Sequence, residues 1–147
     1  MDDVRPSVED AIALAAHAHR GQRYPSPEAE PYVFHPLRVM LSLVDPVDQM
    51  AAVLHDAVED TDLELHDLTD AGYPAPLVGV IDILTLRSNE SYEDYIERVA
   101  TNDIARRVKI ADLGENLANN RRSPEAPGNA DRIARYEWAL ERLGSSS

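Results

Sequence analysis

The chain has 147 residues, no cysteine and a formal net charge of −13 at pH 7, with 44% hydrophobic and 28% charged residues. The lack of cysteine excludes disulfides, iron–sulfur clusters, thiolate zinc sites and cysteine nucleophiles. The negative charge disfavours DNA, RNA and anionic membranes as partners, and the sequence has neither a signal-peptide pattern nor an apolar segment of membrane length, so we expect a cytoplasmic protein.

The N-terminal part of the chain is predicted to begin with a helix over residues 7–19. Its first residues, SVED, form a capping-box pattern in which Ser7 can cap the helix and Asp10 can bond back to it. Apolar residues recur at helical spacing along this segment, and Gly21 is expected to end it. Residues 24–31 hold three prolines and should therefore form a loop.

A second helix is expected to open at His35-Pro36, because proline is tolerated in the first turn of a helix. Asp45-Pro46 should break this helix, and Asp45 is a suitable cap for a third helix over residues 47–59. The apolar face of the second helix is predicted to consist of Leu37, Met40, Leu41 and Val44.

The middle of the chain is predicted to hold a short helix over residues 63–70, capped by Thr61-Asp62, and then a turn at 72–76. The apolar run at 77–84 contains β-branched residues and could form a strand. We assign it to a helix, because a proline precedes it where a first helical turn tolerates one and because no partner strand is evident.

The C-terminal part is predicted to be helical apart from a loop at 123–128. Helices are expected at 91–100, at 103–119 and from Asn129 or Asp131 to Gly144. The chain has no internal repeats or linkers. The predicted fold is therefore all-α, a compact single-domain helical bundle over residues 1–144 with a frayed tail at 145–147.

Charge is distributed unevenly along the chain. From Met40 to Leu86 the sequence has ten acidic residues and no lysine or arginine, whereas basic residues flank this block on both sides. An acidic centre between basic flanks could hold a cation and present it to an anionic ligand. A solvated acidic surface explains the same pattern, and composition alone favours that simpler interpretation.

The segment LHDAVEDT, residues 54–61, places two ionisable pairs in a predicted hydrophobic helix. The pairs are His55-Asp56 and Glu59-Asp60. Residues four apart share a helix face, so each member of the first pair aligns with one member of the second. A metal held by the first pair would leave the second pair within reach of a metal-bound water, where its carboxylates could act as the general base. The alternative is an acidic helix end without a function, which is mildly unfavourable to the helix dipole.

Two more candidate ligands lie outside this segment, His35 at a predicted helix start and Asp112 in a later helix. Imidazole nitrogen and carboxylate oxygen together suit Mn, Fe, Zn or Ni better than Mg or Ca. Each residue also has a simpler interpretation, because a lone histidine at a helix start is usually a surface residue and Asp112 could pair with Lys109 or Arg107. The other histidines are expected in solvent-exposed or structural positions: His17, His19 and His66.

Four sequence blocks in this order resemble a known family. They are AHRGQR (18–23), EPYVFHPLRV (30–39), AAVLHDAVEDT (51–61) and VKIADLGEN (108–116). Together they resemble the HD-domain phosphohydrolases, and within them the hydrolase domain of RelA/SpoT homologues and the small alarmone hydrolases. The segment DRIARYEWALERL (131–143) is similar to the closing helix of that branch.

The resemblance implies an all-α fold of the HD-domain type that binds one divalent metal, typically Mn²⁺. It implies a (p)ppGpp 3′-pyrophosphohydrolase, in which a metal-bound hydroxide attacks phosphorus. Glu59 and Asp60 match the pair that activates the water in this family. The implied metal ligands are His35, His55, Asp56 and Asp112.

The resemblance also implies contacts to a small phosphorylated nucleotide. Asn116 matches a residue that contacts the nucleotide, and Arg20 and Arg23 match basic residues near the phosphates. Lys109 and Arg87 could add local attraction for a polyphosphate. Tyr32 is expected to pack beside the metal.

The sequence departs from this family next to the phosphates, where YPSPEAE replaces a basic stretch and Leu113 follows the last ligand. Two alternatives therefore stay open. One is the same chemistry on another nucleotide, such as the 2′-phosphate of NADPH, and the other is a non-catalytic nucleotide-binding regulator. Oligomerisation is compatible with the sequence.

Overall fold

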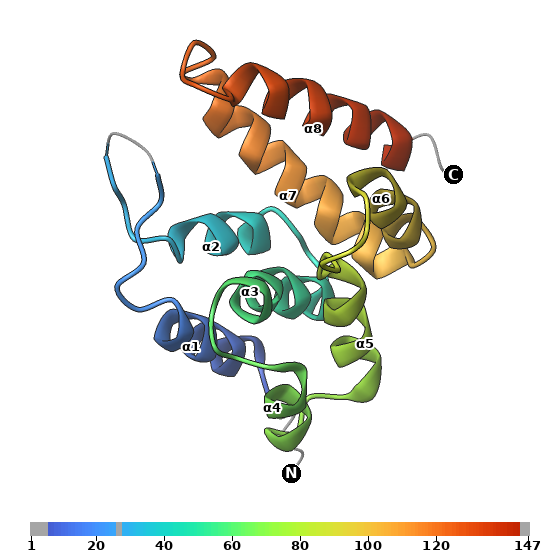
Figure 1. Ribbon diagram of the computed structural model, residues 1–147. Coiled ribbons are helices and arrows are strands. Elements are labelled where there is room, and N and C mark those ends of the chain that lie inside the picture. Colours follow the sequence, from blue (N-terminus) through green and yellow to red (C-terminus); the bar gives the residue numbers. More distant parts are fainter. Residues whose placement is uncertain (1–5, 26–27, 145–147) are drawn as a thin grey trace.

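The computed structural model of the chain describes residues 6–25 and 28–144, and these residues form an all-α fold (Figure 1). The helices are α1 (Val8–Ala18), α2 (Phe34–Leu41), α3 (Pro46–Asp60), α4 (Leu65–Asp70), α5 (Ala75–Leu84), α6 (Tyr92–Ala100), α7 (Asp103–Arg121) and α8 (Asn129–Gly144). Within the described part, β-structure is limited to an isolated bridge between Arg23 and Pro31. The all-α prediction is confirmed, and the predicted frayed tail at 145–147 lies outside the described residues.

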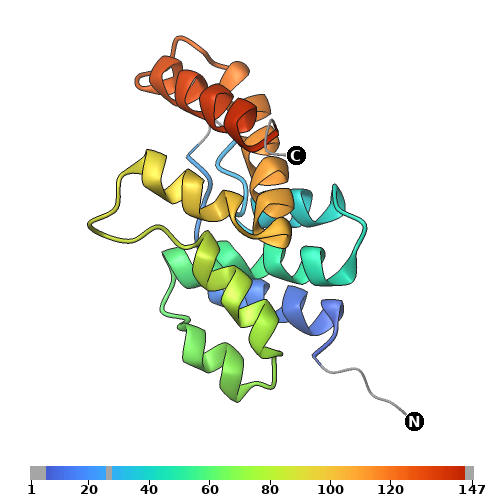
Figure 2. The same cartoon turned by 90° about the vertical axis from the view of Figure 1, so that its right-hand side faces the viewer.

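Helix α3 is the centre of the fold. Seven successive residues, 51–57, are buried, so the helix is covered on all sides rather than along one stripe. Helices α1, α2, α5 and α7 pack against it. Figure 1 shows α3 in the middle of the molecule, and Figure 2 shows the α7–α8 pair on one side of it. The pair His55-Asp56 lies in this enclosed stretch of α3, and the pair Glu59-Asp60 follows it at the exposed end of the same helix.

Several helix starts follow from local capping. Ser7 and Asp10 form the predicted capping box, with the Asp10 N–H donating to Ser7 Oγ at 3.1 Å. Asp45 Oδ1 accepts from the Val47 N–H at 2.8 Å, and Pro46 occupies the first turn of α3. The run at 77–84 is helical, as predicted, and its buried side chains recur at helical spacing: Leu77, Val80, Ile81 and Leu84.

The predicted apolar face of the second helix is wrong in part. Leu41 is 73% exposed and Val44 is 92% exposed, whereas Val39 is fully buried. The helix begins at Phe34, ahead of the predicted His35-Pro36 start, and ends at Leu41. Val44 therefore lies in the loop that follows, and the buried residues of α2 are His35, Pro36, Val39 and Met40.

The predicted cap of the short fourth helix is also wrong. The helix begins at Leu65 and Glu64 caps it. Thr61 instead terminates α3, because its hydroxyl donates to the Ala57 carbonyl at 2.6 Å and accepts from the Leu63 N–H at 3.1 Å. The hydroxyl is thus occupied by the end of one helix and cannot begin the next.

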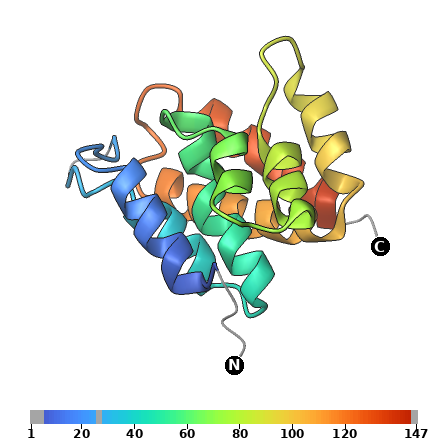
Figure 3. The same ribbon diagram turned by 90° about the horizontal axis from the view of Figure 1, so that it is seen from below.

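The segment between α5 and α6, residues 85–91, extends away from the helices on either side of it (Figure 3). Arg98 holds this segment to α6. Its guanidinium pairs with Glu90 at 2.8 Å and donates to the carbonyls of Ile83 and Thr85. In the described part of the chain, no helix is both long and apolar enough to cross a membrane.

Candidate metal centre and substrate cavity

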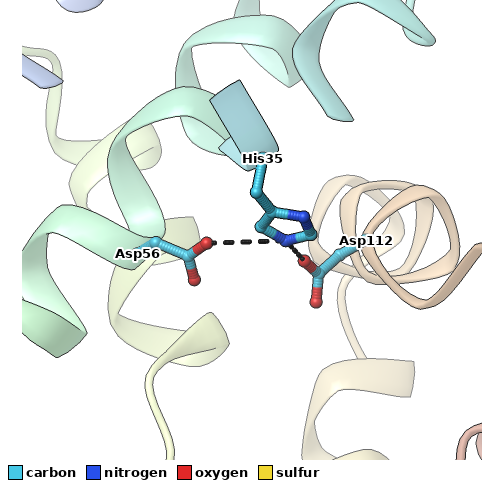
Figure 4. Close-up of side chains that lie close together, drawn as sticks. All are labelled: His35, Asp56 and Asp112. Carbon is cyan, nitrogen blue, oxygen red and sulfur yellow. Dashed lines mark hydrogen bonds and ion pairs between the residues drawn. The ribbon is translucent and has the colours of Figure 1, made fainter. Parts of the chain in front are cut away.

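Three helices bring His35, Asp56 and Asp112 together in the interior (Figure 4). His35 comes from α2, Asp56 from α3 and Asp112 from α7, and all three are buried. His35 Nε2 lies 2.8 Å from Asp112 Oδ1 and 3.8 Å from Asp56 Oδ2. One ligand atom from each residue lies within 4.8 Å of the others, so the set could hold a metal ion.

His55 lies beside this set and is oriented by its own helix. Its Nδ1 is 2.9 Å from the Ala52 carbonyl oxygen, which can only accept, so Nδ1 carries the proton of the neutral ring. The buried Nε2 therefore presents a lone pair. It lies 3.1 Å from Asp56 Oδ1 without making a hydrogen bond. In the neutral ring this lone pair faces a carboxylate oxygen, an arrangement that a shared cation would satisfy, so the residues present suit a divalent metal.

Lys109 offsets part of the negative charge of the cluster. Its Nζ lies 3.1 Å from Asp112 Oδ2, while the other oxygen of Asp112 faces His35. Burial raises the pKa of Asp112, but the charge of Lys109 and the hydrogen bond from His35 outweigh it and leave the pKa well below its usual range. Burial lowers the pKa of His35, yet the hydrogen bond to Asp112 and the nearby carboxylates raise it overall.

Glu59 and Asp60 lie at the exposed end of α3, next to Asp56. One oxygen from each of these three carboxylates lies within 4.8 Å of the others. Burial, together with the charges of Asp56 and Glu59, raises the pKa of Asp60 to about 6. Glu59 Oε2 accepts a hydrogen bond from the Leu86 N–H at 3.0 Å, so the segment between α5 and α6 holds this carboxylate.

Tyr32 packs beside the cluster, as predicted. Its hydroxyl donates to Asp56 Oδ2 at 3.2 Å, and its ring centroid lies 6.0 Å from that of His35. Burial and the charge of Asp56 raise the pKa of Tyr32 well above its usual range, so the phenol stays protonated and acts as a donor. Tyr32 therefore fixes the orientation of one carboxylate of the cluster.

A cavity of about 300 Å³ opens onto these groups. Two of the predicted substrate contacts, Lys109 and Asn116, line it, together with Glu59 and Asp60. A second cavity, of about 550 Å³, lies between the ends of α7 and α8. Both cavities have Tyr24, Pro25, Asn116 and Tyr136 in their walls.

The other predicted phosphate contacts lie outside both cavities. Arg20 and Arg23 are exposed in the segment that follows α1. The guanidinium of Arg87 is engaged at the end of α5, where it donates to the carbonyls of Asp82 and Thr85 at 2.7 Å each.

The sequence interpretation missed the arginines that line the second cavity, Arg122 and Arg132. Arg122 pairs with Glu28 at 2.9 Å, and Arg132 donates to Asn129 at 2.9 Å. The spacing of Arg132 and Tyr136, four residues apart on one helix face, was the available signal.

Comparisons with known proteins identify the relatives of this chain, although no protein-family model matches it. The chain is 37% identical over 144 residues to the guanosine-3′,5′-bis(diphosphate) 3′-pyrophosphohydrolase MESH1 of Danio rerio, covering 90% of this chain and 79% of that protein. It is 35% identical over 144 residues to MESH1 of Homo sapiens, covering 90% and 80%.

The fold agrees with this relationship. A solved structure described as "A metazoan ortholog of SpoT hydrolyzes ppGpp and plays a role in starvation responses" superposes with a TM-score of 0.71 at 24% identity, covering 97% of this chain and 96% of that one. The resemblance to HD-domain alarmone hydrolases inferred from the sequence blocks is confirmed. The chain belongs to the MESH1 family of guanosine-3′,5′-bis(diphosphate) 3′-pyrophosphohydrolases.

Proposed function

We propose that this protein removes the 3′-pyrophosphate from ppGpp or pppGpp with the help of one divalent metal ion. The observation that carries the proposal is the buried cluster of His35, Asp56 and Asp112, with the buried Nε2 of His55, which has no hydrogen-bond partner, beside it. It lies at a cavity in a chain 37% identical to a hydrolase of that substrate. The mixed nitrogen and oxygen donors favour Mn²⁺ over Mg²⁺ or Ca²⁺.

In the reaction, a water oxygen forms a bond to the phosphorus that is linked to the 3′ oxygen. The bond between that phosphorus and the 3′ oxygen breaks. Pyrophosphate leaves, and the 3′ oxygen takes a proton to become a hydroxyl. When bound, the metal ion supplies Lewis-acid activation of water and of the phosphoryl oxygens. The protein has to orient the water, accept its proton and offset negative charge near the phosphates.

Asp60 is the best candidate for accepting the proton. A base is most effective when its pKa lies near the working pH, and the pKa of Asp60 is raised to about 6. Glu59 is fixed by the Leu86 N–H and is suited to orienting the water. The two carboxylates thus have different proposed roles because their surroundings differ: Glu59 is held by a backbone N–H, and the pKa of Asp60 is raised by burial and by nearby charges.

The remaining contacts suit a highly charged nucleotide. Lys109 lines the first cavity, where its ammonium group is 3.1 Å from Asp112 and can also face a phosphoryl oxygen. The second cavity has room for the rest of the molecule, with Asn119 and Asn120 as hydrogen-bonding groups and Arg122 and Arg132 as cations. The net charge of −13 supports a small free nucleotide rather than DNA or RNA as the substrate.

A substrate panel tests this proposal. Purified protein with Mn²⁺ is offered ppGpp, pppGpp, NADPH and GDP, and the products are separated by anion exchange. We expect pyrophosphate and the matching 5′-nucleotide in equal amounts from ppGpp and pppGpp, with kcat/KM at least about tenfold above that for NADPH, a difference of about 1.4 kcal/mol. Faster release of orthophosphate from NADPH would assign a 2′-phosphatase, and nucleotide binding without turnover would assign a regulator.

A further inference from the structure

His19 is a buried residue behind the site that the proposed chemistry does not use. It caps the C-terminal end of α1 and is 2% exposed, so of the two positions that the sequence favoured, solvent-exposed or structural, the exposed one is wrong. Its Nδ1 lies 2.7 Å from Gln22 Oε1, and its buried Nε2 has no hydrogen-bond partner. Gln22 in turn donates from its amide nitrogen to the backbone carbonyl of Asp60 at 3.1 Å.

The donor and acceptor of each hydrogen bond in the series His19–Gln22–Asp60 follow from its last member, the Asp60 carbonyl. A carbonyl can only accept, so the amide nitrogen of Gln22 must face Asp60 and its amide oxygen must face His19. That oxygen also only accepts, so the proton of the neutral imidazole lies on Nδ1. The three residues therefore form one ordered path from α1 to the end of α3.

The acceptor is a carbonyl that the helix itself leaves free. Asp60 is the last residue of α3, and the last four carbonyls of a helix have no partner within it. Helix ends fray, and fraying here would rotate the Asp60 carboxylate away from its neighbours. Gln22 holds this carbonyl from outside the helix, and His19 holds Gln22.

The same short segment supports the tyrosine beside the cluster. The Tyr32 N–H donates to the Gln22 carbonyl at 2.8 Å, and the rings of His19 and Tyr32 lie 5.1 Å apart between centroids. Gly21, with φ of +86°, allows the turn that places Gln22 between the two. Residues 19–22 therefore contact both Tyr32 and Asp60 from outside the first cavity.

We infer that His19 is a positioning residue that acts through Gln22 to fix the end of α3 and thereby the Asp60 carboxylate. The inference rests on the proposed function, in which Asp60 accepts the proton of water. His19 lines neither of the two cavities that are proposed to hold the substrate. Its loss should therefore change kcat rather than KM.

Kinetics of three variants and one control variant test the inference. In His19→Phe the ring remains but the donor is lost, and Gln22→Met removes both hydrogen bonds at similar volume. Each should lower kcat about tenfold, which is part of the rate enhancement that a positioned base provides. KM should stay within about twofold of the value for the unmodified protein. His19→Asn should recover most of the loss, because its amide N–H can take the place of Nδ1–H. Val8→Ala, a partly buried position on the same helix, controls for reduced stability and should leave kcat unchanged.

A double-variant cycle separates positioning from general damage. If His19 acts through Asp60, His19→Phe should have no further effect on kcat in an Asp60→Asn background. Additive losses would overturn the inference, as would a His19→Phe kcat within twofold of the unmodified protein. Failure of His19→Asn to recover kcat would also count against it.

Hydrogen exchange gives a readout independent of activity. The Thr61 N–H bonds to the Ala57 carbonyl and reports on the end of α3. In metal-free protein it should exchange at least about threefold faster in Gln22→Met and His19→Phe than in Val8→Ala. Unchanged exchange would overturn the inference, whereas an unmodified protein that turned over no ppGpp while exchange responded as expected would overturn only the proposed function.

Discussion

The buried candidate metal centre and the cavity between α7 and α8 are built in opposite ways. In the centre, His35, Asp56 and Asp112 come from three helices, and their ligand atoms lie within 4.8 Å of one another. In the second cavity, Arg122 and Arg132 are exposed and engage Glu28 and Asn129 at the surface. In the proposed function, the chemistry therefore belongs to the core and recognition of the nucleotide belongs to the surface.

The difference has a physical cause. Charges in the interior need partners at close range, because an unpaired buried charge is strongly destabilising. Surface ion pairs contribute about 1 kcal/mol or less, so their geometry is weakly determined by folding. Single substitutions in the candidate metal centre should therefore cause large losses of metal binding, stability or kcat. Single substitutions in the second cavity should cause only small changes in KM.

The largest effect is expected from Asp56→Asn. Asp56 is common to both groups of candidate ligands, so the change should weaken metal binding and lower kcat by about 10³-fold or more. Steady-state kinetics and calorimetric Mn²⁺ titration measure both. Asp48→Asn is the matched control, since Asp48 is also buried on α3 but pairs with Arg107 at 2.8 Å. A control that lost metal binding as strongly would remove the distinction between the two aspartates.

The substitution Lys109→Met should make the metal-free protein less stable. The change leaves Asp112 buried with one cationic partner fewer, which we expect to lower the free energy of unfolding by about 3 kcal/mol. Saturating Mn²⁺ should restore most of the loss, because the metal provides positive charge at the same carboxylate. Denaturant titration with and without metal measures this, and an equal loss in both conditions would contradict the proposed site.

Substitution of both arginines of the second cavity should weaken substrate binding without stopping turnover. In the variant Arg122→Gln, Arg132→Gln we expect KM for ppGpp to rise about tenfold, with kcat within about twofold, because each lost charge contributes roughly 0.5–1 kcal/mol at an exposed site. Initial-rate kinetics measure both constants. A fall in kcat as large as that of Asp56→Asn would show that the two regions are not separable.

The metal-free protein should become more stable, relative to Asp60→Asn, as pH falls from about 7 to about 4. The pKa of Asp60 is about 6 in the folded protein against a usual 3.8. Above pH 6 the carboxyl is ionised in both states, and the folded state bears the repulsion. Below about pH 4 it is protonated in both states and the penalty is gone. Thermal unfolding of the two proteins across this range measures the change, and a difference independent of pH would contradict it.

The smallest effect is expected at Arg20 and Arg23. Both are exposed outside the cavities, so we expect them to act only through long-range attraction. Arg20→Gln and Arg23→Gln should each raise KM less than about threefold, and the effect should vanish at high ionic strength because salt screens exposed charges. A larger, salt-independent rise in KM would indicate direct contact with the phosphates.

The sequence predicted the parts of this molecule that depend on local pattern. The helical spacing of LHDAVEDT predicted the two ionisable pairs on α3, and the sequence blocks predicted that His35 and Asp112 belong with them. Contacts between distant elements decided the rest. The burial of His19 depends on how α1 packs against the segment before α2, and the confinement of Arg87 depends on carbonyls exposed at the end of α5.

The central claim is that the buried cluster binds a divalent metal on which hydrolysis depends. The most direct test strips the protein of metal with a chelator, adds Mn²⁺ back stepwise and measures pyrophosphate release from ppGpp together with bound metal. We predict no release without metal, full activity at one Mn²⁺ per chain, and neither binding nor release in Asp56→Asn. Equal release from the stripped protein, or full activity in Asp56→Asn, would contradict the account.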